Sequence, residues 1–143
     1  AALHTILPGL EENAWTWSLK KSEWAINQIL CHLRDVEHEV YLPRIHSLLT
    51  ENYPHISAID TDRWAEERNY FQQSGEEAFY HFSDSRLQLI DQLANLSPEQ
   101  WKRPARHSLL GPTTLAEIFK IATDHDLLHL AQIRSSLASF QTQ

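Results

Sequence analysis

The chain has 143 residues, of which 42% are hydrophobic and 22% charged, and its formal net charge is −7 with histidine neutral. This length suits one domain with a substantial core, and the composition is globular rather than disordered. An acidic chain lacks the basic surface that releases counterions from DNA or RNA, so we expect no nucleic-acid partner.

The cysteine content and the hydropathy of the chain indicate which cellular compartment to expect for the protein. The single cysteine, Cys31, cannot form a disulfide within the chain, so the fold does not depend on an oxidising compartment. No stretch approaches the roughly 20 apolar residues of a membrane-spanning helix. We therefore expect a soluble, cytoplasmic protein with no membrane partner, folded as a single domain over residues 1–143.

The first half of the chain predicts helices separated by one loop. Residues 3–17 have a weak helical pattern that Pro8 interrupts. Residues 25–50 predict a clearer helix, because their apolar side chains recur at spacings of three and four. An exposed loop is expected over residues 53–61, and a short helix over residues 62–73.

Two later helices begin at capping boxes, in which two residues three apart each bond the other's backbone N–H. Ser74 with Glu77 begins the third long helix, which should end before Ser97. Thr114 with Glu117 begins the last helix. Three glycines and six prolines leave few breakers for a many-turned β fold, and we predict no strand. The four amphipathic segments indicate an all-α four-helix bundle.

Three polar side chains fall on the apolar face of the last helix. Drawn at about 100° per residue, His125 and His129 lie within its apolar stripe, and Asp126 points inward too. Burying such groups unpaired costs on the order of 1–3 kcal/mol each. Residues four apart lie one above the other on a helix, so one metal ion could take both imidazoles. The alternative is a pair of hydrogen-bonded core histidines, but three inward polar groups favour a metal site.

A divalent ion with an open coordination position usually takes three protein ligands, so a third is needed from another helix. His32 on the second helix and His81 on the third both lie at the border of an apolar stripe. The helical pattern does not choose between them. The histidines that we expect on the solvated surface or in loops are His38, His46, His55 and His107.

Glu37 and Arg44 lie near the centre of the apolar face of the second helix. They are seven residues apart and so line up along the helix. The simplest interpretation is a buried ion pair, or a network that also includes Tyr41. The functional alternative makes Glu37 an acid–base group or a support for the metal ligands, and makes Arg44 the binding group for an anionic substrate.

Two runs of this sequence resemble the DinB-like proteins. The run from Trp24 to Glu37 (WAINQILCHLRDVE) is similar to the start of their second helix. Residues 111–115 (GPTTL), followed by residues 125–133 (HDLLHLAQI), are similar to their last helix. The similarity covers nearly the whole chain and includes residues 41–44 (YLPR).

The resemblance implies a four-helix bundle with up-down-down-up connectivity and a divalent metal ion, zinc or nickel, held by three histidines. It assigns the third ligand to His32, beside His125 and His129. Dimers are common in this family, so the resemblance also implies a homodimer. It further implies that the substrate is a small molecule. Characterised relatives include S-transferases and isomerases that use a low-molecular-weight thiol.

The leading hypothesis is a metal-dependent enzyme, a thiol-dependent transferase, in which the ion lowers the pKa of a bound thiol or water. Asp126 would orient an imidazole or assist proton transfer. The alternatives are a metal-dependent hydrolase and a non-catalytic, stress-related bundle that binds a metal or a small ligand. A zinc protease fits poorly, because aspartate replaces the glutamate of the His-Glu-x-x-His motif and no strand is predicted to hold a peptide.

Overall fold

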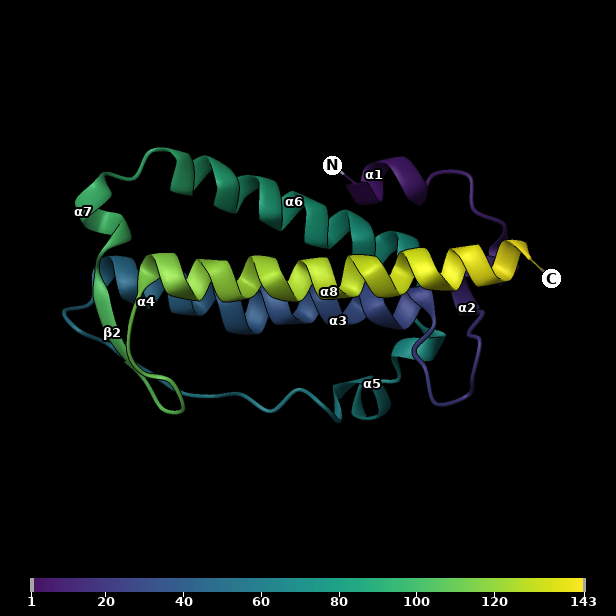
Figure 1. Cartoon of the computed structure of the whole chain (residues 1–143), viewed down its shortest axis with the longest axis horizontal. Helices are drawn as coiled ribbons and strands as arrows, with labels where there is room; N and C mark the ends of the chain where they lie inside the picture. The colour runs from purple at the N-terminus through teal and green to yellow at the C-terminus, as the bar shows by residue number, and fades with distance from the viewer. Residues whose placement is uncertain (1, 143) are drawn as a thin grey trace.

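The computed structural model describes residues 2–142, and its long helices lie side by side along one axis (Figure 1). In chain order the elements are α1 (Ala2–Ile6), α2 (Glu12–Thr16), α3 (Ile26–Val36), η1 (Glu37–Tyr41), α4 (Leu42–Thr50), β1 (His55–Ile56), α5 (Trp64–Glu67), η2 (Tyr70–Gln72), α6 (Gly75–Ala94), α7 (Pro98–Trp101), β2 (Pro104–His107), β3 (Gly111–Thr114) and α8 (Leu115–Gln141).

The predicted four-helix-bundle fold is confirmed. The segment α3–α4 and helix α6 run in the same direction, and α8 returns antiparallel to both (Figure 1). The first helix of the bundle is represented by α1 and α2, which lie at the end where α3 begins. The predicted interruption at Pro8 is also confirmed, because α1 ends at Ile6 and α2 begins at Glu12.

The second helical segment is continuous from Ile26 to Thr50 but contains the π turn η1. Within it the Leu42 N–H donates to the Glu37 carbonyl, five residues back. We attribute this turn to Pro43, because proline lacks an N–H and its ring clashes with the carbonyl four residues earlier in a regular α-helix. The helix predicted over residues 25–50 is therefore present, with one wider turn in its middle.

A small sheet closes one end of the bundle, which corrects the prediction that the chain has no strand. β2 pairs antiparallel with β3, so that Pro104 lies opposite Thr114, and β1 pairs parallel with β2. β1 falls inside the loop predicted over residues 53–61. The strands have two to four residues each, too few for an alternating pattern to appear in the sequence.

Both predicted helix starts are confirmed. The Ser74 hydroxyl accepts from the Glu77 N–H at the start of α6. Thr114 and Glu117 form the complete capping box at the start of α8, with each side chain bonding the other's backbone N–H. Because Thr114 also ends β3, the hairpin fixes where α8 begins and thus where its histidines lie.

Close approach of α6 to α3 depends on Gly75. A Cβ atom placed there would lie 2.7 Å from Cε3 of Trp15 and 2.9 Å from Cα of Asn27. Real Cβ contacts are not this short, so glycine lets the first turn of α6 pack on α3. The interior is mainly aliphatic. Its buried polar residues on the helical segments are Asn27, His32, Asp35, Glu37, Ser85 and His129, and those on the strands are His107 and Thr113.

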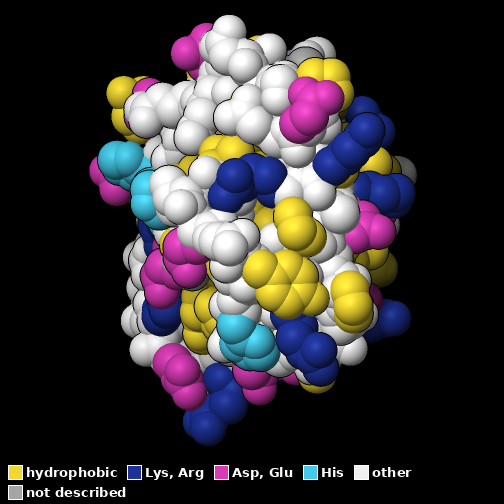
Figure 2. Space-filling model, turned by 90° about the vertical axis from the view of Figure 1, so that its left-hand side faces the viewer, with side chains coloured by type: hydrophobic (Ala, Val, Ile, Leu, Met, Phe, Trp, Pro, Cys, Tyr) yellow, Lys and Arg dark blue, Asp and Glu magenta, His cyan; other side chains and the backbone are white. Residues whose placement is uncertain are grey.

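Among the described residues, no helix is long and apolar enough to cross a membrane. Figure 2 shows the end of the molecule that carries α7 and β2. On this face Lys and Arg side chains alternate with Asp and Glu, and hydrophobic side chains lie between them. Neither positive nor negative charge therefore predominates on this face.

Candidate metal centre

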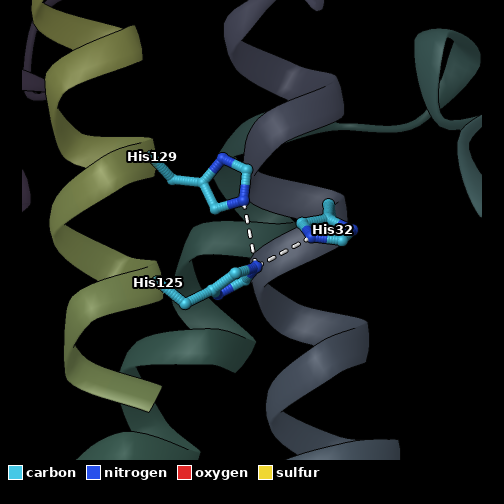
Figure 3. Close-up of side chains that lie close together, drawn as sticks. All are labelled: His32, His125 and His129. Atoms are coloured by element: carbon cyan, nitrogen blue, oxygen red, sulfur yellow. Dashed lines mark hydrogen bonds between the residues drawn. The ribbon is translucent and has the colours of Figure 1, made fainter. Parts of the chain in front are cut away.

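The three histidines that were expected to share an ion meet inside the bundle (Figure 3). His32 comes from α3, and His125 and His129 lie one turn apart on α8. The Nε2 atom of His125 is 3.1 Å from Nε2 of His32 and 3.1 Å from Nε2 of His129. At this spacing one ion could bind all three, since zinc lies about 2.0–2.1 Å from an imidazole nitrogen.

Gln132 shows which nitrogen of His129 faces the other rings. Its side-chain oxygen Oε1 lies 2.7 Å from Nδ1 of His129. A carbonyl oxygen only accepts, so Nδ1 carries the proton and Nε2 directs a lone pair toward His125. A proton on Nε2 of His125 can be donated to only one of its two neighbours, His32 or His129. A cation at the meeting point uses all three lone pairs, so these residues fit a metal ion.

Burial keeps the three imidazoles neutral. The pKa of His32 is lowered to about 3, chiefly by desolvation and then by the nearby His129 and His125. The pKa of His125 is lowered to about 4, chiefly by desolvation and then by His129 and Arg86. The pKa of His129 is lowered by burial as well. Because metal ions bind the neutral ring, all three side chains are in the ligand form at neutral pH.

Packing holds the rings where hydrogen bonds do not. The Nδ1 atoms of His32 and His125 are buried and have no hydrogen-bond partner among the described residues. The Trp24 ring lies 5.0 Å from the His32 ring and stacks on His129 at 6.3 Å, within 10° of parallel. The Tyr41 ring meets His125 edge-on at 5.9 Å. Two aromatic side chains thus take part in orienting the site.

The three histidines line a pocket of about 810 Å³. Its walls come from α8, from the segment before α3 and from the start of the α5 region. Among the described residues that line it there is no Lys or Arg, and the acidic ones are Glu23 and Asp62. Its hydroxyl groups belong to Ser18, Ser22, Thr61, Ser135, Ser136 and Ser139. A small polar molecule could therefore reach the face of the histidine cluster.

Glu37 and Asp126 share one arginine that the sequence analysis did not consider. Arg86 of α6 donates from Nε and Nη2 to the two oxygens of Glu37, both at 2.7 Å, and its Nη1 donates to Asp126. The Glu37 side chain is 0% exposed. This corrects the expected pairing of Glu37 with Arg44 or Tyr41. It also gives Asp126 a guanidinium partner in place of an imidazole.

Arg44 lies elsewhere. Its Nη2 donates to the Ser57 carbonyl at 2.9 Å, and its side chain lines a second, smaller pocket together with His107. The first pocket and this one share no lining residue. A role for Arg44 in anchoring an anionic substrate beside the three histidines therefore has no support from its position.

The remaining histidines are separated from the cluster. His81 is exposed and its ring contacts Tyr80, so the structure brings His32 and not His81 to the other two. His38 is exposed, as expected, and lies 2.8 Å from the Ser85 hydroxyl. His107 was expected in a solvated loop, which is wrong: it is 6% exposed and belongs to β2.

Two residues of the site had signals in the sequence that were missed. Arg86 lies four residues after Phe82 and three before Leu89, inside the apolar stripe of α6, where a charge needs a partner. Gln132 follows His129 by three residues, which puts it on the same helix face.

The chain is similar to known proteins in both sequence and fold. A sequence model of the DinB superfamily matches residues 1–133. The solved structure of YfiT from Bacillus subtilis, described as "a probable metal-dependent hydrolase with an unusual four-helix bundle topology", superposes with a TM-score of 0.83. The two are 19% identical over 98% of this chain and 79% of that chain, a likeness that shows the fold. No curated protein matches the chain. The chain belongs to the DinB superfamily.

Proposed function

We propose that this protein is a metal-dependent enzyme in which His32, His125 and His129 hold one divalent ion. The observation that carries the proposal is the meeting of three neutral Nε2 atoms at the wall of a pocket of about 810 Å³. Three protein ligands beside an open pocket are typical of catalytic rather than structural zinc sites. The description of YfiT as "a probable metal-dependent hydrolase" agrees with this proposal.

A divalent ion held there would lower the pKa of a water molecule or thiol that binds to it, which supplies a nucleophile at neutral pH. The chain contributes the neutral ligands and their orientation, with Gln132 holding the His129 ring. Glu37, Arg86 and Asp126 together carry one net negative charge. Asp126 favours positive charge at His129. We assign Asp126 the role of favouring positive charge at His129, and Glu37 the role of holding Arg86 in place, since neither carboxylate lines the pocket.

A thiol nucleophile would come from a second substrate and not from the chain. Cys31 is the only cysteine in the sequence. It is buried, its pKa is raised to about 11 by desolvation, and its Sγ lies 3.7 Å from the Gln73 side-chain oxygen. Thiolates attack and thiols do not, so this side chain is inert at neutral pH. The resemblance to thiol-dependent relatives therefore points to a small diffusible thiol, with zinc or nickel as the ion.

The test combines metal content with turnover. Protein purified without a histidine tag is analysed for metals and assayed with 4-nitrophenyl acetate, and with a small thiol plus 1-chloro-2,4-dinitrobenzene. We expect about one ion per chain and a metal-dependent rate in one of the two assays. His129→Ala should lose both, whereas the exposed control His81→Ala should keep both. Bound metal without turnover of either kind of substrate would contradict the enzymatic proposal.

One observation favours a second candidate, a non-catalytic metal-binding bundle. Asp126, the carboxylate whose charge acts on His129, is paired with Arg86, and no carboxylate among the described residues bonds an imidazole of the cluster. The acidic residues that line the adjacent pocket are Glu23 and Asp62. Under this candidate His129→Ala lowers the metal content and the melting temperature, and the unmodified protein has no metal-dependent rate to lose.

A further inference from the structure

A second pocket of about 380 Å³ lies where the tip of the β2–β3 hairpin approaches residues 58–59 and the first half of α8. Its polar lining residues are Arg44 and His107. The apolar ones include Ile59, Leu109 and Leu110. Nothing in the proposed metal chemistry uses these residues, so the pocket calls for an explanation of its own.

Arg44 is a half-buried cation without an acidic partner. Its Nη2 donates to the Ser57 carbonyl, but its Nε is buried and has no hydrogen-bond partner among the described residues. None of the ion pairs within the described part of the chain includes it. Leaving a buried donor unpaired is unfavourable, and a bound anion would remove that cost.

His107 supplies a second donor beside this guanidinium. Its Nδ1 accepts from the backbone N–H groups of Leu109 and Leu110, at 3.2 and 3.3 Å. The proton of the neutral ring is therefore on Nε2. Its pKa is lowered by burial and then by the positive charge of Arg44, which places the two side chains within electrostatic reach of each other. An anion in this pocket would meet one full positive charge and one neutral donor.

The rest of the pocket is apolar and partly open to solvent. Leu109 is 79% exposed, Leu110 57%, Ile59 44% and Ile121 37%. An exposed patch of large apolar side chains that is rimmed by polar groups often marks a binding site. The volume of about 380 Å³ lies in the range of small-ligand sites.

We propose that this second pocket binds an organic carboxylate with an apolar tail. The carboxylate lies between Arg44 and His107, and the tail lies along Ile59, Leu109 and Leu110. A single carboxylate matches the single guanidinium, whereas a phosphate dianion would leave one charge uncompensated. The apolar lining favours a ligand with an apolar part over a bare inorganic anion, which would gain nothing from it.

Calorimetric titration with decanoate tests the proposal, and decanol is the uncharged comparison. The unmodified protein should bind decanoate more tightly than decanol, and Arg44→Gln should weaken decanoate binding roughly 10-fold or more. His129→Ala should leave decanoate binding unchanged, because the two pockets share no residue. Loss of binding in that variant would mean that decanoate binds at the histidine cluster, which overturns the proposal.

The Leu109→Asp variant should fold as the unmodified chain does, because the side chain of Leu109 is largely exposed. A carboxylate at this position repels the ligand carboxylate and removes apolar contact, so decanoate binding should weaken while the melting temperature stays the same. The proposal is overturned if the protein does not bind decanoate, if decanol binds equally well, or if folded Arg44→Gln and Leu109→Asp bind decanoate as the unmodified chain does.

Discussion

The Nδ1–H group of His129 donates to the side-chain oxygen of Gln132 at 2.7 Å, and this contact directs the ring's lone pair toward His125. The contact between His129 and Gln132, which lie on one turn of α8, thus determines the tautomer of His129. The neighbouring imidazoles have no comparable bond, since their Nδ1 atoms lack partners among the described residues. Among the described residues, Gln132 is therefore the one residue outside the cluster that hydrogen-bonds one of its imidazoles.

Gln132→Ala should lower metal affinity about 10- to 100-fold, because outer partners of metal-bound histidines typically contribute that much. Gln132→Glu keeps an acceptor oxygen at the same distance and should keep the affinity. Competition with a chelator of known affinity measures both. Equal affinities for Gln132→Ala and the unmodified chain would show that the contact does not orient a ligand.

Metal affinity should change little between about pH 7.5 and pH 5.5. Histidines with a pKa near 6.5 would become mostly protonated over this interval, and the affinity would fall by about tenfold per ligand. In the folded protein the pKa of His32 is about 3 and that of His125 about 4, so neither imidazole competes with protons in this range. Chelator competition at several pH values checks this, and a steep loss would contradict the lowered pKa values.

Stability of the metal-free protein should fall as the pH drops below about 6.5. An unfolded histidine titrates near 6.5, whereas the folded pKa of His32 is about 3. Between these values the unfolded chain binds more protons, so the free energy of unfolding decreases as the pH falls. His32→Asn removes this group and should flatten the dependence in urea unfolding curves measured from pH 7 to pH 4. An unchanged slope would show that His32 is not the group responsible.

Arg86→Met should destabilise the protein by about 3–5 kcal/mol, because it leaves the fully buried Glu37 carboxylate without its bidentate partner. Adding Glu37→Gln to this variant should restore part of the loss, since the amide carries no charge. Urea unfolding of the two variants measures the difference. If both lose the same free energy, the cost comes from packing of the arginine and not from the unpaired charge.

Gly75→Ala should cost about 1–3 kcal/mol, since the new methyl group meets Trp15 and the Asn27 backbone at less than 3.0 Å. Ser83→Ala, at a half-buried position on the same helix, serves as the comparison and should change stability little. Thermal unfolding checks both. Equal melting temperatures would mean that α6 can shift away from α3 without loss.

Features that depend on short-range rules could be predicted from the sequence. The spacing of His125 and His129, the capping box at Thr114 and the long apolar stripes all follow from the geometry of a single helix. The third histidine was different, because His32 and His81 both lie at a stripe border and only contact between helices separates them. The resemblance to DinB-like proteins supplied that choice, and the structure agrees with it.

Partners from different elements could not be predicted in the same way. The ion pair of Glu37 with Arg86 joins η1 to α6, and a wheel drawn for one helix favours Arg44 because it lies on the same face. The strands were missed because each is paired through its backbone, which leaves no side-chain pattern in so few residues. His107 was placed in a loop for the same reason.

The histidine cluster draws one ring from α3 and two from α8, and 93 residues separate His32 from His125 along the chain. An ion bound there acts as a cross-link that ties the second helix of the bundle to the last. Closing so long a segment in the unfolded chain is entropically costly, so the linkage forms only once the helices have docked. The loaded protein should therefore resist unfolding more strongly than the metal-free protein.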